Sequence, residues 1–219
     1  MPITNDLNLG SKVLAAVLGG KIALHGLPVA QRWTRLAASV DTGDDTITLA
    51  RPATGWAVNH PILITSSSFN PHQAEVRTIT AISPDNLTLT LDQPLAWPHF
   101  ANVLDIPGAA NGPMDMRAEV GLLGASITIR AADGTVQYGP GGEKFGCRVV
   151  GNGASMLLLT DVAIVHGGQA GLERAAVLFD RLAPLDALAF NLSGNGTVAN
   201  PSALINSALS YSMDSAVEL

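Results

Sequence analysis

The chain has 219 residues and a formal net charge of −6, and 47% of its residues are hydrophobic while only 14% are charged. Its 12 basic residues form no cluster, which argues against nucleic-acid binding, and no apolar run reaches the roughly 20 residues of a membrane-spanning helix. An acidic surface also repels polyanions such as hyaluronan unless a basic groove or a bound cation intervenes.

The first half of the chain alternates apolar and polar residues, which is typical of antiparallel strands with one solvated face. The expected strands span residues 21–26, 45–50, 61–65, 75–82 and 86–91. Turn-forming residues at 83–86 predict that the last two of these strands form a hairpin.

The second half instead carries short, continuous apolar runs separated by Gly, Asn and Asp. These runs span residues 125–130, 147–150, 156–159, 161–166 and 176–179. No stretch keeps a 3.6-residue period over the length of a helix, so the pattern predicts an all-β sandwich, barrel or parallel β-helix. A loop rich in Gly and Pro at 107–113 predicts a boundary between residues 105 and 118.

Cys147 is the single cysteine, so a disulfide within this sequence is excluded and we expect a small buried thiol. The alternative is a bond to a partner chain or to another part of a longer chain. The apolar segment 13–18 fails as a secretory signal because it follows Asp6 and runs directly into Gly19-Gly20-Lys21. Three glycosylation acceptors nevertheless favour a secreted chain, at Asn86, Asn191 and Asn195. An extracellular chain of this kind would be part of a longer protein.

Several segments between residues 9 and 180 carry motifs in a recognisable order. The segment 10–26 ends in Gly-Gly-Lys-Ile-Ala-Leu-His-Gly, residues 33–36 read Trp-Thr-Arg-Leu, and residues 56–75 contain Trp-Ala-Val, Ile-Leu-Ile-Thr-Ser-Ser-Ser-Phe and Gln-Ala-Glu. The most specific segment, 115–123, reads Asp-Met-Arg-Ala-Glu-Val-Gly-Leu-Leu. Together these segments resemble the end of the eight-glycine domain and the region that follows it in fibrocystin and the cell-surface hyaluronidases.

This resemblance implies a fold and a location. The fold would be a right-handed parallel β-helix, a solenoid, preceded by antiparallel strands from the end of a glycine-rich β domain. Residues 1–30 would be the C-terminal strands of the eight-glycine-type domain, 31–112 a β-rich connecting region, and 113–219 the coils of the parallel β-helix. The chain would be extracellular or on the cell surface, possible sites including the cilium, as part of a larger glycoprotein.

The resemblance also bears on catalysis. The hyaluronidases of the family carry two histidines in a motif that aligns with residues 174–180, and here Leu178 and Asp180 stand in their places. Cleavage of a sugar needs positioned proton donors and acceptors, so this replacement argues against an enzyme. The weak catalytic candidates that are left are His166, Glu173 and Asp180, of which the two carboxylates could flank a glycosidic bond. As plain structural residues, the two carboxylates would be solvated and His166 would cap a strand.

Four further residues are candidates for binding, namely Trp97, Arg117, Glu119 and Arg174. Trp97 follows a turn and is exposed enough to stack on a glycan, whereas Trp33 and Trp56 are expected to seal the core. Arg117 and Glu119 share one face of an extended segment, where they would bind a ligand or, as we expect, form a structural ion pair or hydrogen-bond link that locks the first β-helix coil to the upstream domain. No cofactor or metal site is predicted, because the histidines lack metal-ligand spacing.

These observations favour a non-catalytic structural or binding module whose partners are the rest of a parent chain, neighbouring chains or glycans. The alternative is a polysaccharide-cleaving, hyaluronidase-like domain with altered catalytic residues. A test of hyaluronan and neutral glycans for depolymerisation separates the two hypotheses.

Overall fold

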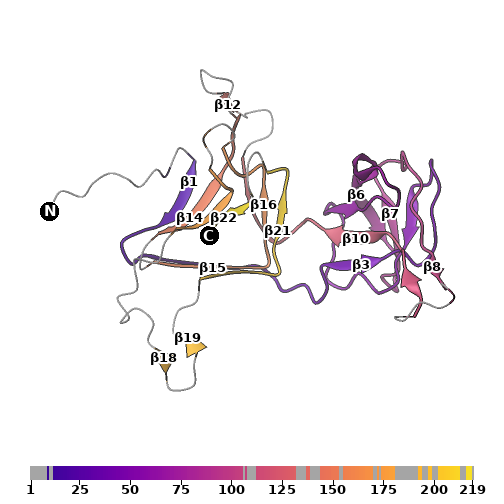
Figure 1. Ribbon diagram of the computed structural model, residues 1–219, viewed down its shortest axis with the longest axis horizontal. Helices are drawn as coiled ribbons and strands as arrows, with labels where there is room; N and C mark the ends of the chain where they lie inside the picture. Colours follow the sequence, from indigo (N-terminus) through magenta and orange to yellow (C-terminus); the bar gives the residue numbers. More distant parts are fainter. Residues whose placement is uncertain are drawn as a thin grey trace. The chain divides into compact units, whose positions relative to one another are not determined.

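The computed structural model describes residues 9, 12–105, 107, 112–131, 137–138, 144–152, 155–169, 172, 174–180, 192–193, 197–198, 202–212 and 216–218. Within these residues the chain is all-β, with one short 3-10 turn, η1 (Pro71–Gln73), and no helix that could span a membrane. The chain divides into two compact units, Met1–Leu27 with Ala125–Leu219 and Pro28–Gly124 (Figure 1). We call the first the parallel unit and the second the closed-sheet unit.

The parallel unit consists mainly of three sheets of parallel strands. The first contains β1 (Val13–Ala16), β14 (Arg148–Asn152), β17 (Val177–Asp180) and β22 (Val217–Glu218); the second β2 (Lys21–His25), β15 (Met156–Thr160) and β20 (Ala203–Ile205); the third β11 (Ile127–Arg130), β16 (Val162–Val165) and β21 (Ala208–Ser210). The chain enters the sheets in the same order three times, first through β1, β2 and β11, then through β14, β15 and β16, and then through β17, β20 and β21. Each pass therefore lies in register on the previous one.

The register also aligns the corners between strands. Thr160 at the end of β15 pairs with His25 of β2 and with Ile205 of β20, so the following residues, Gly26, Asp161 and Asn206, occupy one corner. Asp161 and Asn206 both have left-handed backbones, with φ of 54° and 47°, which Asp and Asn tolerate better than most residues. The Asn206 amide donates a hydrogen bond to the Asp161 carboxylate, so the corner residues of successive passes are linked.

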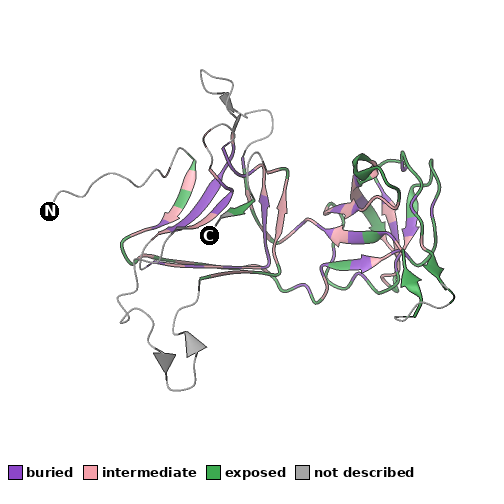
Figure 2. Cartoon of the chain, viewed as in Figure 1, coloured by how far each residue is buried: buried purple, intermediate pink, exposed green. Residues whose placement is uncertain are grey.

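An apolar core fills the parallel unit. Alternate residues of β15 point inward, and Leu157 and Leu159 are fully buried together with Val149, Val162 and Ile164 (Figure 2). The inward side chains come from all three sheets, so each pass buries its apolar face between the others.

The direction of the first strands differs from the expectation. Residues 21–26 were predicted as antiparallel because they alternate, yet β1 pairs in parallel with β14, and β2 pairs in parallel with β15. Alternation reports that one face of a strand is solvated and carries no information on the direction of its partner. The assignment of residues 1–30 to an eight-glycine-type domain stays a prediction.

The closed-sheet unit is antiparallel, as its alternating sequence predicts. Its strands lie in the order β3 (Trp33–Arg35), β10 (Glu119–Leu122), β5 (Pro61–Ile64), β6 (Glu75–Ile82), β7 (Thr88–Leu91) and β4 (Thr46–Thr48). The predicted hairpin of β6 and β7 is confirmed by the pairing of Ile82 with Leu89. The end strands meet through a bridge between Leu36 and Leu49, so the sheet closes on itself.

The inner side of the closed sheet holds a second apolar core. Leu36, Ile47, Ile62, Ile79 and Val120 are all fully buried. Trp56 covers this core, as expected from its sequence position, and its indole N–H donates to the Gln31 carbonyl oxygen at 2.7 Å.

Three small hairpins complete the described strands. They are β8 (Val103–Leu104) with β9 (Met114–Asp115), β12 (Gln137–Tyr138) with β13 (Lys144–Phe145), and β18 (Leu192–Ser193) with β19 (Thr197–Val198).

Candidate functional site

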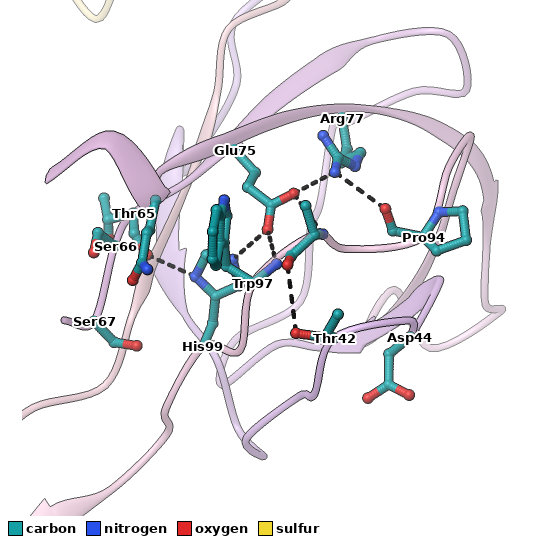
Figure 3. A network of polar contacts seen from close by, with 12 residues as sticks. Thr42, Asp44, Thr65, Ser66, Ser67, Glu75, Arg77, Pro94, Trp97 and His99 are labelled. Carbon is teal, nitrogen blue, oxygen red and sulfur yellow. Dashed lines mark hydrogen bonds and ion pairs between the residues drawn. The ribbon is translucent and has the colours of Figure 1, made fainter. Parts of the chain in front are cut away.

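A buried carboxylate organises one end of the closed-sheet unit. Glu75 begins β6 opposite Ile64, so its side chain points inward and is 5% exposed. It accepts hydrogen bonds from the backbone N–H groups of Ala96 at 2.9 Å and Trp97 at 2.8 Å. It also forms an ion pair with Arg77 (Figure 3). One carboxylate thereby fixes the loop that carries Trp97.

His99 completes this network from the interior. Its ring is fully buried, with Nδ1 2.9 Å from the Thr65 carbonyl oxygen and Nε2 3.1 Å from the Glu75 carboxylate. His99 thus links the Thr65 carbonyl oxygen to the Glu75 carboxylate from inside the unit, with the donor and acceptor roles of the two ring nitrogens set by the tautomer.

These contacts set the electrostatics of Glu75. Burial raises the pKa of this carboxyl, but hydrogen bonds from the Ala96 N–H, the His99 ring and the Trp97 N–H, with the charge of Arg77, outweigh it and lower the pKa below its ordinary value. Glu75 is thus an ionised structural clamp. The sequence alone did not identify Glu75 as a functional residue. Residues 75, 77 and 79 point to the same face of β6, and Ile79 is buried, so this spacing could have indicated that Glu75 and Arg77 lie on the inner face.

The clamp presents an aromatic side chain to solvent. Trp97 is 43% exposed, in agreement with the expectation, and the Thr42 hydroxyl donates to the neighbouring Ala96 carbonyl oxygen at 3.4 Å. A nearby segment of the same chain forms an open polar hollow, lined by Ala38, Ser39, Val40, Gly43, Asp44, Asp45, Thr46 and Thr48. Its two carboxylates make this side unfavourable for anionic ligands.

A second cluster of polar side chains lies on the outer face of the closed sheet. Arg117 binds Asp115 through two nitrogens, at 2.9 and 2.7 Å. Arg35 binds Asp115 at 2.9 Å and Glu119 at 3.4 Å. Arg117 thus pairs with Asp115, and Glu119 pairs with Arg35, because β3 places Arg35 directly opposite Glu119. The predicted link of Arg117 and Glu119 to an upstream domain stays a prediction.

This cluster holds its charges firmly. The two hydrogen bonds from Arg117 keep the pKa of Asp115 well below its usual range, and Asp115 in turn raises the pKa of Arg117. The Arg35 guanidinium lies 5.6 Å from the ring centre of Trp33, within cation–π range. Trp33 is 52% exposed, contrary to the expectation that it seals the core, because it lies on the face of β3 opposite to that of the buried Thr34.

The weak catalytic candidates lie in the parallel unit. His166 follows β16 with a left-handed backbone, and its ring packs at 5.3 Å against that of Tyr211, which occupies the equivalent corner after β21. The Arg174 guanidinium donates to the buried side chain of Gln169 at 2.8 Å. Glu173 and the side chain of Asp180 lie outside the described residues, so the suggested carboxylate pair stays a prediction.

Cys147 and Arg148 have structural surroundings. The Cys147 thiol is buried, as expected, and burial raises its pKa. Arg148 is 2% exposed and donates to the carbonyl oxygens of Ala175 at 3.0 Å and Leu9 at 2.9 Å, which ties neighbouring segments together.

Among the glycosylation acceptors, Asn86 lies half-buried in the turn between β6 and β7. Asn191 and Asn195 lie outside the described residues. In the part of the chain that the structure describes, no three His, Cys, Asp or Glu side chains gather as metal ligands would.

The fold and the two polar clusters define an all-β module made of stacked parallel strands and a closed antiparallel sheet. In sequence the chain is 31% identical to human fibrocystin-L over 174 residues, which is 76% of this chain and 4% of that protein. It is 30% identical over 177 residues to a G8 domain-containing protein of Dictyostelium discoideum, covering 80% of this chain and 11% of the relative. The chain is thus a relative of the fibrocystin-like and G8 domain-containing proteins, and it spans only a small part of their length.

No family model matches the chain. Among solved structures, the tailspike gp49 of Pseudomonas phage LKA1 is 18% identical, with 72% of this chain and 23% of that chain covered at a TM-score of 0.31. The Gp54 tailspike of Acinetobacter baumannii bacteriophage AP22 is 7% identical, with 77% and 21% covered at a TM-score of 0.32. Likeness at this level carries no argument about function. The hyaluronidase part of the resemblance stays an expectation.

Proposed function

We propose that the chain is a non-catalytic structural and binding module of a large extracellular or cell-surface protein. The observation that carries this proposal is the repeated, in-register parallel pairing of strands in three sheets. We take these sheets as the faces of a right-handed parallel β-helix. Each pass then pairs its backbone with the passes on either side, which gives an element stiff enough to act as a spacer.

The relatives support the setting of this module. The chain matches only 3% to 12% of the length of the relatives to which it is similar, so the remainder of a larger parent chain is its first expected partner. The fibrocystin likeness supports an extracellular or cell-surface location, including that of a cilium. Modification at Asn86, Asn191 and Asn195 would fit that location.

Binding is the role we propose for the closed-sheet unit. It exposes two tryptophans, Trp33 and Trp97, beside charged and hydroxyl-bearing side chains. Exposed aromatic rings next to polar groups are suited to ligands that have both an apolar face and hydroxyls. Glycans have this character, and protein partners are the alternative.

The test combines retention with size analysis. The chain is immobilised and exposed to neutral oligosaccharides and to hyaluronan, and the sizes of the glycans are measured after prolonged incubation. We expect neutral glycans to be retained and every glycan to keep its size. Shortening of a glycan that disappears in Glu173→Gln or Asp180→Asn would overturn the non-catalytic assignment in favour of the cleaving domain.

A further inference from the structure

The outer face of the closed sheet contains a gap beside Trp33. Trp33 of β3 pairs with Gly121 of β10, which in turn pairs with Leu63 of β5, so the three residues form one row across the sheet. A Cβ atom built on Gly121 would meet no atom within 4 Å. Because Gly121 has no side chain, the outer face is lowest there, between the side chains of Trp33 and Leu63, and we call this row the trough.

The size of this trough is set by the sheet. Neighbouring strands lie about 4.8 Å apart, so Trp33 and Leu63 stand about 10 Å apart across Gly121. This width admits one six-membered sugar ring. A stable protein interface buries about 800 Å² on each partner, which is far more apolar surface than three residues supply.

The rim of the trough provides hydrogen-bonding groups. Arg35 and Glu119 form the next outward-facing pair of the same two strands, and their side chains are 33% and 49% exposed. Arginine has five N–H donors and a carboxylate has acceptor sites for about four hydrogen bonds, so both can bind hydroxyls in addition to each other. Asp115 and Arg117 hold this rim in place through the ion pairs described above.

The charges of the rim select the ligand. Arg35 and Arg117 balance Asp115 and Glu119, so the four side chains sum to zero, and the whole chain has a net charge of −6. A polyanion gains no attraction at such a surface. A neutral sugar has an apolar C–H face that can stack on the indole and hydroxyls that can reach the rim.

We infer that Trp33, Gly121 and Leu63, with Arg35 and Glu119 at the rim, form a binding site for one neutral pyranose ring of a glycan. The inference rests on the proposed glycan-binding function and assigns its location. Position 121 is where the site can be closed without disturbing the fold, because its backbone is extended and a Cβ atom there would meet no atom within 4 Å.

The experiment uses the full chain and a panel of neutral β-glucan, mannan and galactan oligosaccharides, with hyaluronan oligosaccharides as the anionic arm. Binding is measured by calorimetry, and the backbone amide of Gly121 and the indole N–H of Trp33 are followed by NMR. We expect a neutral member to bind and to shift both signals. In Gly121→Val, whose side chain fills the trough, binding should weaken at least about tenfold while the melting temperature stays the same or rises, since valine favours strands.

Trp33→Ala should weaken binding to a similar extent, whereas the control Phe69→Ala, which removes an exposed aromatic ring of the same unit outside the proposed binding residues, should leave it within about twofold. Binding that survives both Gly121→Val and Trp33→Ala, or that is lost only in Trp97→Ala, overturns the assigned site and leaves the glycan-binding function standing. A chain that binds no neutral member of the panel contradicts both the site and the glycan part of the proposed function.

Discussion

The Glu75 carboxylate is contacted by the backbone N–H groups of Ala96 and Trp97, by the buried ring of His99 and by Arg77 of the same strand. A buried carboxylate stabilises the fold only while its partners are present, because loss of a partner leaves the remaining charge buried without compensation. His99 was noted in the sequence for lacking metal-ligand spacing, and its pairing with Glu75 was not foreseen. The two residues are 24 positions apart, and tertiary contacts of His99 with Val40 and Thr65 bring its ring to Glu75.

Glu75→Gln should lower the free energy of unfolding by about 2–4 kcal/mol, because an amide has one acceptor oxygen in place of two and removes the negative charge that pairs with Arg77. Urea unfolding followed by tryptophan fluorescence measures the change. The control is Glu119→Gln, which removes an exposed carboxylate and should alter the value by no more than about 0.5 kcal/mol. Equal effects of the two substitutions would argue against the clamp.

The same carboxylate predicts a dependence on pH. The pKa of Glu75 is lower in the folded chain than its ordinary value of 4.5, so its contribution is present above that value and is lost as the pH falls through the folded value. The stability difference between the wild type and Glu75→Gln should therefore be largest near pH 7 and shrink below about pH 4.5. Urea unfolding at pH 7, 5.5, 4 and 3 tests this, and a difference that does not change with pH would contradict it.

At the scale of strands and corners, the sequence located most elements but not their partners. Alternation identified residues 75–82 and 86–91 as a hairpin, since the turn between them is local. The direction of β2 depends on β15, which lies far along the chain, and no local pattern encodes that choice. The apolar runs at 156–159 and 161–166 correctly indicated strands buried in parallel sheets.

The corner occupied by Gly26, Asp161 and Asn206 gives a prediction for the stacking of strands. A Cβ atom at Gly26 would lie 2.1 Å from the Asp161 carbonyl oxygen, which is fixed by the backbone. Gly26→Ala should therefore destabilise the parallel unit by at least about 2 kcal/mol, measured by thermal unfolding. Gly121→Ala is the matched control, because its side chain meets open space, and its unit should unfold at an unchanged or higher temperature. A harmless Gly26→Ala would show that the corners are not tightly stacked.

For the whole molecule, the main finding is that one unit is inserted into the other. The closed-sheet unit, Pro28–Gly124, separates β2 from β11, which belong to the same pass through the three sheets. The sequence indicated an all-β chain and a change of character near residue 105, but the return of the chain to its first strands after residue 124 was not foreseen. The arrangement depends on the pairing of β1 and β2 with β14 and β15, which follow the inserted unit in the sequence. The composition of the strands does not indicate which strands pair.

The insertion predicts that the parallel unit folds without Pro28–Gly124. The Leu27 N–H donates to the Ser126 hydroxyl at 2.7 Å, so the two ends of the insertion are neighbours within the parallel unit. Replacing residues 28–124 with a short Gly-Ser linker should give a β-rich circular dichroism spectrum and a cooperative thermal transition.

Residues 28–124 expressed alone should unfold in a transition of their own, and the intact chain should show both. A deletion variant without a cooperative transition would show that the parallel unit depends on the insertion.

The hydrogen bond between Leu27 and Ser126 has a consequence for how such proteins can change over time. The inserted unit begins and ends at neighbouring positions of the parallel unit. Another domain whose termini lie close together could therefore replace it without a change in the core of the parallel unit. The surface of the inserted unit can then change while the core of the parallel unit stays the same. The same junction offers a place to graft a reporter domain into the parallel unit.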